Sequence, residues 1–565
     1  ADAQAYAEAY GIRAEIGELG FERPVHEIDY GVGYFVNSGN IIVRAGVDIE
    51  EAVTASADDG EAGAAALLGA EYNIYSCYDH CGPDTNAIAY GIALDEGEDG
   101  GYLSGDFFNL GLVVAEAKAV ATLYADAAVD DGDDTSALAV AGGELAAQAF
   151  GVALDDIYSD GGFVNEDDIA AMARTEIDAF AFADSDDGPA TALIGSNIPY
   201  DFEPGNLGTN YATAGATGVE IDDSDFDDGF WNGGNISASA FVSTKTEADA
   251  HGDERALAAA RNYAAAQAIG VNLTNSWFGD DITNAGVIRG IAAASTEIDA
   301  TAHGDEAQAS TGDSEDSSAW TVATSMGLMV DGSDGADVRN GYDVEDDYDA
   351  AAQIWALAGA FSNSRAVATG ETLATASAGN TEQASATGYG DDDIYGGRFT
   401  NHGLVVAGAL AYGEQSAEAT TDTAHSIASA SAYDTAEAYA VGVDTVASNV
   451  SNYGAIFAGV GAIANADARA QGAAARSEAT ATADATATGM EMQTYSEEGG
   501  YLYNTGDIKA YALAQAYASA ESIFSKNYDE SWSDANAYAN AEAVGLNIAS
   551  SSHLEEFHND ADGVI

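Results

Sequence analysis

The chain is poor in cations: 16 Lys and Arg residues stand against 95 Asp and Glu residues among 565, giving a formal net charge of −79. Phosphate recognition needs stripes of Lys and Arg, so this balance excludes a nucleic-acid binder. It also argues against adsorption to anionic membranes. Two explanations of the acidity remain, namely a solvated surface adapted to high salt or a chain that binds divalent cations.

Long apolar runs, cysteine and proline are also scarce. No run approaches the roughly 18 residues of a membrane-spanning helix, and no signal peptide is visible. The only cysteines are Cys77 and Cys81, which flank His80 closely. We predict a small Cys77–Cys81 disulfide loop in an oxidising compartment. Two free thiols, or a metal held through Cys77, His80 and Cys81, are the alternatives.

The sequence instead contains a repeat, which predicts one continuous domain over residues 1–565 with about ten repeats of about 58 residues. The first half of a repeat opens with Asn-x-Gly-x-apolar, although the copy at Asn165 lacks the Gly, and the second half closes with Ala-x-Ala-x-Gly and an apolar residue. The openings are Asn37, Asn109, Asn165, Asn232, Asn284, a degenerate Asp346, Asn401, Asn452, Asn504 and Asn559. The closing glycines are Gly11, Gly91, Gly151, Gly218, Gly270, Gly327, Gly388, Gly442, Gly489 and Gly545.

Between these signals, Ala alternates with polar residues. From Ser477 to Gly489 the sequence reads SEATATADATATG. Such a period of two places every Ala on one face of a strand and the polar residues on the other. A helix is the alternative, because Ala is the best helix former, but the polar residues would then lie all round it. We therefore predict two β-arms of roughly 10 to 14 residues per repeat, joined by a variable acidic loop.

The predicted fold is all-β, a β-solenoid or a stack of β-arms with an Ala-lined interior. One pair of arms cannot bury its Ala face alone, whereas stacked neighbours can. Asn side chains in identical turns can hydrogen-bond along such a stack. The closing glycines are expected to supply a positive φ or a close backbone approach.

This combination resembles the secreted, repetitive β-solenoid surface proteins of prokaryotes, such as haemagglutinin-like and autotransporter-passenger proteins, over nearly the whole chain. The resemblance implies an extracellular or cell-surface location. The repeat is longer than a usual solenoid coil, which leaves the cross-section and the handedness open.

Carboxylates gather between the arms in Gly-punctuated segments, whose oxygens suit Ca²⁺. The stretch from Gly388 to Gly397 resembles a single calcium-binding nonapeptide of secreted toxins, with Gly390 and Asp392 at ligand-bearing positions. Calcium is thus the one expected cofactor, and a solvated surface charge is the alternative. The candidate calcium-binding residues are Asp130, Asp131, Asp133, Asp134, Asp184, Asp186, Asp187, Asp222, Asp223, Asp225, Asp331, Asp334, Gly390 and Asp392.

Catalysis is not expected. Paired carboxylates can cleave polysaccharides, but the acidic residues are spread over every repeat and no pair stands out. The eight His residues share no repeat position with a nucleophile, and neither a phosphate-binding loop nor a zinc-protease signature occurs.

Both ends of the sequence interrupt a repeat: residues 1–12 match a second arm, and residues 559–565 match the start of a first arm. We predict that these halves pair between chains and build a head-to-tail homopolymer; a closed ring and an excerpt of a longer protein are the alternatives. The predicted function is a structural subunit of an extracellular filament or sheath. The alternative is a monomeric, calcium-stabilised surface adhesin that binds glycans or other cells. The residues expected at the joint are Ala1, Ala3, Ala5, Ala7, Ala9, Gly11, Asn559, Gly563, Val564 and Ile565.

Overall fold

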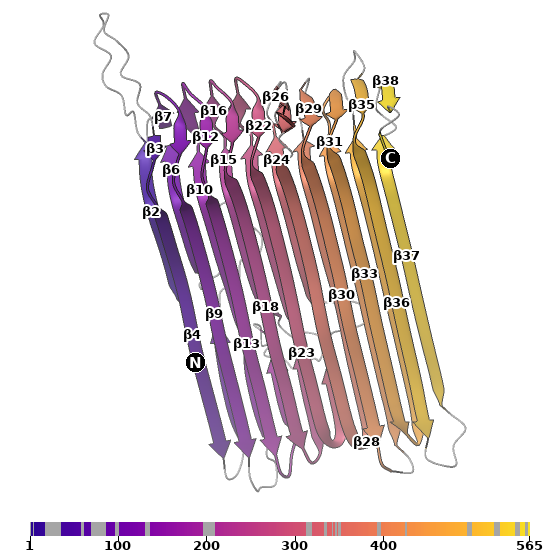
Figure 1. Ribbon diagram of the computed structural model, residues 1–565. Helices are drawn as coiled ribbons and strands as arrows, with labels where there is room; N and C mark the ends of the chain where they lie inside the picture. Colours follow the sequence, from indigo (N-terminus) through magenta and orange to yellow (C-terminus); the bar gives the residue numbers. More distant parts are fainter. Residues whose placement is uncertain are drawn as a thin grey trace, which may run out of the picture.

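The computed structural model shows a stack of β-coils, in which each strand lies beside its equivalent from the next repeat (Figure 1). Every regular element of the described residues is a strand, and none is a helix that could cross a membrane. The all-β solenoid prediction is therefore confirmed. The structure describes the chain except residues 1, 4, 17–34, 58–60, 69–85, 97–100, 130–135, 196–208, 312–318, 333–335, 342, 345–346, 349–351, 393–396, 424–425, 494–499, 525–530, 549–553 and 560–562.

The first arms of successive coils pair parallel and in register. One of them, β28, continues into the second arm of its coil within a single strand, and β23 continues only into residues 306–310, which precede its second arm. The first-arm strands are β4 (Ile41–Ala57), β9 (Val113–Val129), β13 (Ile169–Ser185), β18 (Asn235–Gly252), β23 (Val287–Ser310), β28 (Gln353–Asp392), β30 (Leu404–Thr421), β33 (Ala455–Gly472) and β36 (Asp507–Phe524).

The second arms form the facing layer and also pair parallel. Their strands are β2 (Tyr6–Ile16), β6 (Asn86–Glu96), β10 (Ser136–Asp155), β15 (Asn210–Asp222), β20 (Asn262–Thr274), β24 (Trp320–Asp331), the later part of β28, β31 (Ile427–Thr445), β34 (Ala474–Met492) and β37 (Trp532–Ile548). Four shorter strands, β1 (Asp2–Ala3), β5 (Glu61–Leu68), β14 (Ala190–Ile194) and β19 (Arg255–Ala260), precede the second arms of their coils.

The two arms of a coil face each other across a core of Ala side chains, and they do not pair as a hairpin. Burial alternates residue by residue, so that Ala485 and Ala487 of β34 are fully buried while Thr486 between them reaches the surface. The inward Ala face is therefore confirmed. The arms are longer than predicted, with 17 residues in β9 and 20 in β10, because the alternation continues into segments that the sequence analysis assigned to loops. We call this layer the Ala core.

Each coil also contains a short strand before its opening Asn, which the sequence analysis did not predict. Together with the adjoining ends of the arms, these strands enclose a second core of large side chains, which we call the short-strand end. Phe107, Phe163 and Phe230 stack there with ring centroids 4.9 Å apart. The short strands are β3 (Phe35–Asn37), β8 (Phe107–Asn109), β12 (Phe163–Asn165), β17 (Phe230–Asn232), β22 (Ile282–Asn284), β25 (Val338–Asn340), β29 (Arg398–Asn401), β32 (Asn449–Asn452), β35 (Gly500–Asn504) and β38 (Leu554–Asn559).

One opening was assigned wrongly. Asn340 in β25 pairs with Asn284 and Asn401 in the neighbouring coils, so Asn340 opens this repeat in place of Asp346, which lies outside the described residues. Gly341 follows Asn340 directly. An inserted antiparallel pair, β26 (Asp343–Val344) and β27 (Asp347–Tyr348), separates Asn340 from the first arm, so the sequence around Asn340 lacks the usual Asn-x-Gly motif. A small corner sheet contains β7 (Gly101–Leu103), β11 (Ile157–Ser159), β16 (Asp225–Phe226) and β21 (Trp277–Phe278).

Candidate functional site

A continuous ladder of Asn side chains runs along the stack at the short-strand end. In each step the Nδ2 of one Asn donates to the Oδ1 of the next at 2.7–2.8 Å. A slip of one residue would leave these amides unpaired, so the ladder fixes the register of every coil. Its members are Asn37, Asn109, Asn165, Asn232, Asn284, Asn340, Asn401, Asn452, Asn504 and Asn559.

The closing glycines allow a close backbone approach, which is the second of the two predicted roles. A Cβ at Gly388 would lie 2.5 Å from the carbonyl oxygen of Gly442 and 2.6 Å from the Val405 side chain. Positive φ occurs instead at a corner column, with φ of 52° at Asp156, 45° at Asp223 and 50° at Asn275. Asp and Asn tolerate this left-handed conformation better than most residues.

The predicted joint residues that the structure describes lie at opposite ends of the stack. Strand β2 pairs with β6 at one end, and Ala5, Ala7 and Ala9 pack against the Ala core. Gly11 continues the column of closing glycines, since a Cβ there would meet the carbonyl oxygen of Gly91 at 2.5 Å. Ala3 pairs with Leu68, while Ala1 lies outside the described residues. A ring within one chain is therefore excluded, because the two half-repeats do not meet.

At the other end, the chain begins one further first arm. Val564 forms a parallel bridge with Asp507, and the Ile508 amide donates to the Val564 carbonyl oxygen at 2.8 Å. The Ile565 side chain lies over Gly545, as the first apolar residue of every coil lies over a closing glycine. Asn559 is the last member of the ladder, and Gly563 accepts a hydrogen bond from its Nδ2 at 3.3 Å.

The C-terminal end of the stack exposes apolar surface. Tyr511 and Tyr517 of β36 are 62 % and 65 % exposed, and Tyr538 of β37 is 61 % exposed. The alternating residues of β37 lie open to solvent, in contrast to the equivalent residues of β34, which the next coil covers. Unpaired strand edges of this kind are templates for further strand addition.

The described carboxylates predicted to bind calcium lie on or beside different strands of the stack. Asp184, Asp186 and Asp187 lie at the end of β13, and Asp331 ends β24. Among the described residues, no group of three or more His, Cys, Asp or Glu is arranged to hold a metal ion. Calcium therefore stays a prediction. Asp130, Asp131, Asp133, Asp134 and Asp334, with the predicted disulfide residues Cys77 and Cys81, lie outside the described residues.

Two predicted candidates, Asp222 and Asp223, come together with Asp155 and Asp156 where the second arm meets the corner; Asp225 follows in β16. Burial and then the neighbouring carboxylates raise the pKa of Asp155 to about 6. The same causes raise the pKa of nearby Glu220 to about 7. In this acidic corner, partly buried carboxyl groups therefore lie close to one another.

The stretch that resembles a calcium nonapeptide continues β28, and Gly390 and Asp392 belong to the strand. Between them Asp391 is buried and well paired: the Tyr389 hydroxyl donates to its carboxylate at 2.7 Å, and the Val446 amide donates at 2.6 Å. Burial nevertheless raises the pKa of Asp391 to about 6.

Two carboxyl groups that the sequence analysis did not single out are buried inside the Ala core. Glu382 of β28 is fully buried and Asp434 of β31 is 1 % exposed. A Cβ at Gly413 of β30 would collide with oxygens of both, so this glycine makes room for them. Burial, followed by the adjacent Asp434, raises the pKa of Glu382, and burial also raises the pKa of Asp434.

The surrounding polar groups donate hydrogen bonds to most of the carboxylate oxygens of this pair. Ser362 donates to Glu382, and the Asn465 amide donates to Asp434 at 2.6 Å. Gln415 Nε2 donates to Ser362 at 2.8 Å and to Asp434 at 3.3 Å. The remaining Glu382 oxygen finds no donor while both carboxyl groups are ionised, so the folded pair is best satisfied with a shared proton. The sequence signal that could have identified this pair is a polar residue at a position where the alternation otherwise places an inward-facing Ala.

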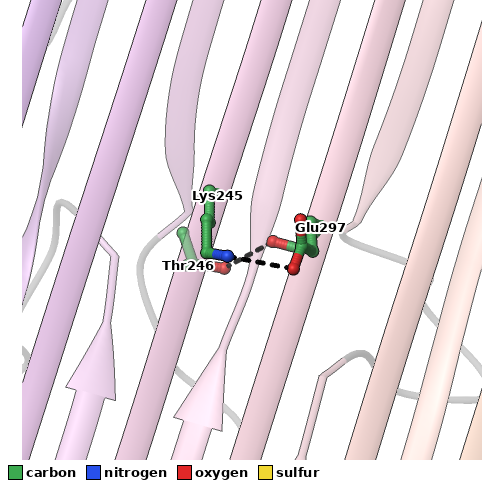
Figure 2. Close-up of polar contacts among 3 residues, drawn as sticks. All are labelled: Lys245, Thr246 and Glu297. Carbon is green, nitrogen blue, oxygen red and sulfur yellow. Dashed lines mark hydrogen bonds and ion pairs between the residues drawn. The ribbon is translucent and has the colours of Figure 1, made fainter.

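Cations of the outer faces pair with carboxylates of the next coil. Figure 2 shows Lys245 of β18 donating to Glu297 of β23 at 3.1 Å, while Thr246 contacts the Glu297 backbone oxygen at 3.5 Å. Arg44 and Glu116 form a similar pair at 2.8 Å. The two ion pairs link coils on the solvent side, where salt screens them, whereas Thr246 is buried.

The outer face of the short-strand sheet carries a groove of about 860 Å³ toward the C-terminal part of the stack. Rings of successive coils line it: His402 and Tyr453 stack at 4.6 Å, and Tyr503 and His558 at 5.2 Å. Arg398 lies in the same groove. No sequence signal marks it, because its residues come from different repeats and meet only through stacking.

No protein-family model, no curated protein and no solved structure matches the chain. The resemblance to secreted β-solenoid surface proteins therefore stays a prediction. Function is inferred from the contacts and exposed surfaces described above.

Proposed function

We propose that this protein is a structural subunit of an extracellular filament, in which the stack of coils continues from one chain to the next. The observation that carries the proposal is the pair of open sheet ends. β2 and β4 lie at one end and β36 and β37 at the other, all parallel and all in the register set by the same ladders. A contact between unlike ends does not close on itself and therefore builds an open fibre.

The ladders support one particular joint. With β2 of the next chain on β37, Gly11 follows Gly545, and Ile41 follows Ile508 and Ile565 in the column of first apolar residues. Asn559 then lies beside Asn37 of the next chain, which extends the amide ladder across the joint. Main-chain pairing would provide the affinity. The Ala faces would oppose a one-residue slip, which turns every Ala outward, and the Asn ladder would fix the register.

At this joint, Val564 and Ile565 would lie between β36 and the β4 of the next chain, where a first arm begins. The ten second-arm layers predict an axial step of roughly 48 Å per subunit at about 4.8 Å per layer.

Electron microscopy of the purified full chain tests the proposal. We expect long fibres with this axial step, favoured by salt or divalent cations because the chains repel each other. A variant lacking residues 1–10 should give short rods that do not elongate, since it loses the first five of the 11 residues of β2. The matched control, Tyr439→Ser on an outer face, should still form fibres. Normal fibres from the truncated chain, or uniform short rods from the full chain, would overturn the proposal.

We also propose that calcium stabilises the stack through its acidic segments. Burial, followed by the neighbouring carboxylates Asp156, Asp222 and Asp223, raises the pKa of Asp155, and a divalent cation would relieve the repulsion among these groups, which supports this role. Chelation should then lower the melting temperature, and NaCl should restore it only in part. A melting temperature that is indifferent to chelator at physiological salt would contradict the calcium proposal without affecting the filament.

A further inference from the structure

The groove on the short-strand sheet spans five successive coils, from Arg339 of β25 to His558 of β38. At about 4.8 Å between neighbouring strands, this span is roughly 19 Å. The groove lies on the outer face of the short-strand sheet. The backbone groups beneath it are used in sheet pairing, so a peptide cannot bind there by strand addition.

The groove mixes donors and acceptors with little net charge. Arg339 is already paired with Asp281 at 2.7 Å, and Arg398 shares the groove with Glu556. Tyr453 and Tyr503 add hydroxyl groups, each of which can donate and accept. Such a set matches a ligand whose own groups both donate and accept, which is the property of sugar hydroxyls.

Aromatic rings supply the apolar part of the surface. Tyr453 is 42 % exposed, and its ring is tilted by 52° against that of Tyr503, with centroids 5.7 Å apart. Ring carbons offer contact to the C–H faces of a saccharide, as aromatic side chains do in small-molecule sites. A polyanion is disfavoured, because the whole chain carries a formal charge of −79.

We infer that this groove binds an uncharged oligosaccharide laid along the stack, so that successive sugar units meet successive coils. The inference goes beyond the filament proposal, because binding needs only the described coils from β25 to β38. The side chains that line the groove repeat along the axis of the stack. The sugar units of the bound saccharide would repeat along the same axis.

Isothermal titration of the full chain with neutral hexasaccharides of glucose, mannose and N-acetylglucosamine tests the inference. Polygalacturonate and a polyglutamate peptide form the anionic arms of the same experiment. We expect at least one neutral hexasaccharide to bind. The double variant Arg398→Ala, Tyr453→Ser should weaken its affinity at least tenfold, whereas the control Tyr439→Ser on another outer face should not change it.

Absence of binding by every neutral hexasaccharide would overturn the inference. Unchanged affinity in the double variant, or a preference for either anionic ligand that the double variant abolishes, would do the same. If the double variant melts at a lower temperature than the parent chain, Tyr453→Phe replaces it. That change removes one hydroxyl and keeps the ring, and it should still weaken binding measurably.

Discussion

The Ala core and the short-strand end hold the same coils together in different ways. In the Ala core the two layers meet through methyl groups that repeat without distinguishing one position from the next. At the short-strand end each coil contributes a large apolar side chain, a close-packed glycine and a hydrogen-bonded Asn at defined places. The first region supplies buried area, and the second determines which residue pairs with which.

This difference has an energetic consequence. Ala buries little area per residue, so the many Ala contacts are individually weak and add up only along long arms. A shift by two residues would keep every Ala inside, because the period of the pattern is two. The same shift would unpair the Asn ladder and drive side chains into the glycine column. Register therefore depends on the short-strand end.

Removing one rung of the ladder should have the largest effect. Asn401 is buried, accepts from Asn340 and the Gly403 amide, and donates to Asn452 at 2.8 Å. Asn401→Ala leaves several buried polar groups short of partners, which cost about 1–3 kcal/mol each. We expect a loss of about 2–5 kcal/mol in the free energy of unfolding from denaturant melts.

The matched control for the ladder is Asn540→Ala on the exposed strand β37. It should change the free energy of unfolding by less than about 0.5 kcal/mol, as surface substitutions usually do. Equal losses in the two variants would mean that the ladder contributes no more than any exposed amide, and the contrast between the two regions would be lost.

Enlarging the Ala core should have a smaller effect. Ala485 and Ala487 are fully buried between the layers, so Ala485→Leu or Ala487→Leu overpacks the core and should cost roughly 1–3 kcal/mol. Thr486→Leu places the same side chain on the outer face and is the control. Unchanged denaturant melts for both buried variants would contradict the inward Ala face.

The sequence predicted the Ala core better than the short-strand end, for a physical reason. Strict alternation over many residues, as in SEATATADATATG, is visible without any knowledge of neighbours. The short strands contain three to six residues, and strands such as Phe163–Asn165 are too short to show a period. Glu382 and Asp434 stood at Ala positions of the alternation and could have been noticed. The groove could not, because its rings meet only when the coils stack.

Acidity should strengthen the Ala core through the buried Glu382–Asp434 pair. Burial raises both pKa values in the folded state, so the folded chain holds protons that the unfolded chain releases above about pH 4. Stability should therefore fall as the pH rises from about 4 through the raised pKa values. Melting temperatures from pH 4 to 8 should show this fall, which the lower charge repulsion at acidic pH accentuates.

The variant Asp434→Asn isolates the pair from the general charge effect. An amide cannot ionise, so the free energy of unfolding of the variant should depend less on pH, by an amount on the order of 1 kcal/mol for each pKa unit removed, and its melting temperature should vary less as well. Glu382→Gln should act in the same direction. Identical pH profiles for the parent chain and both variants would show that the buried pair holds no extra proton.

The smallest effect is expected from the outer faces. Lys245 and Glu297 join two coils at 3.1 Å, but their side chains are 43 % and 50 % exposed, and pairs of this kind contribute about 0–1 kcal/mol. Lys245→Met should therefore lower the free energy of unfolding by less than about 1 kcal/mol, and 0.5 M NaCl should remove most of the difference by screening. A loss as large as that of Asn401→Ala, or one that persists at high salt, would place register control on the solvent side of the arms as well as at the short-strand end.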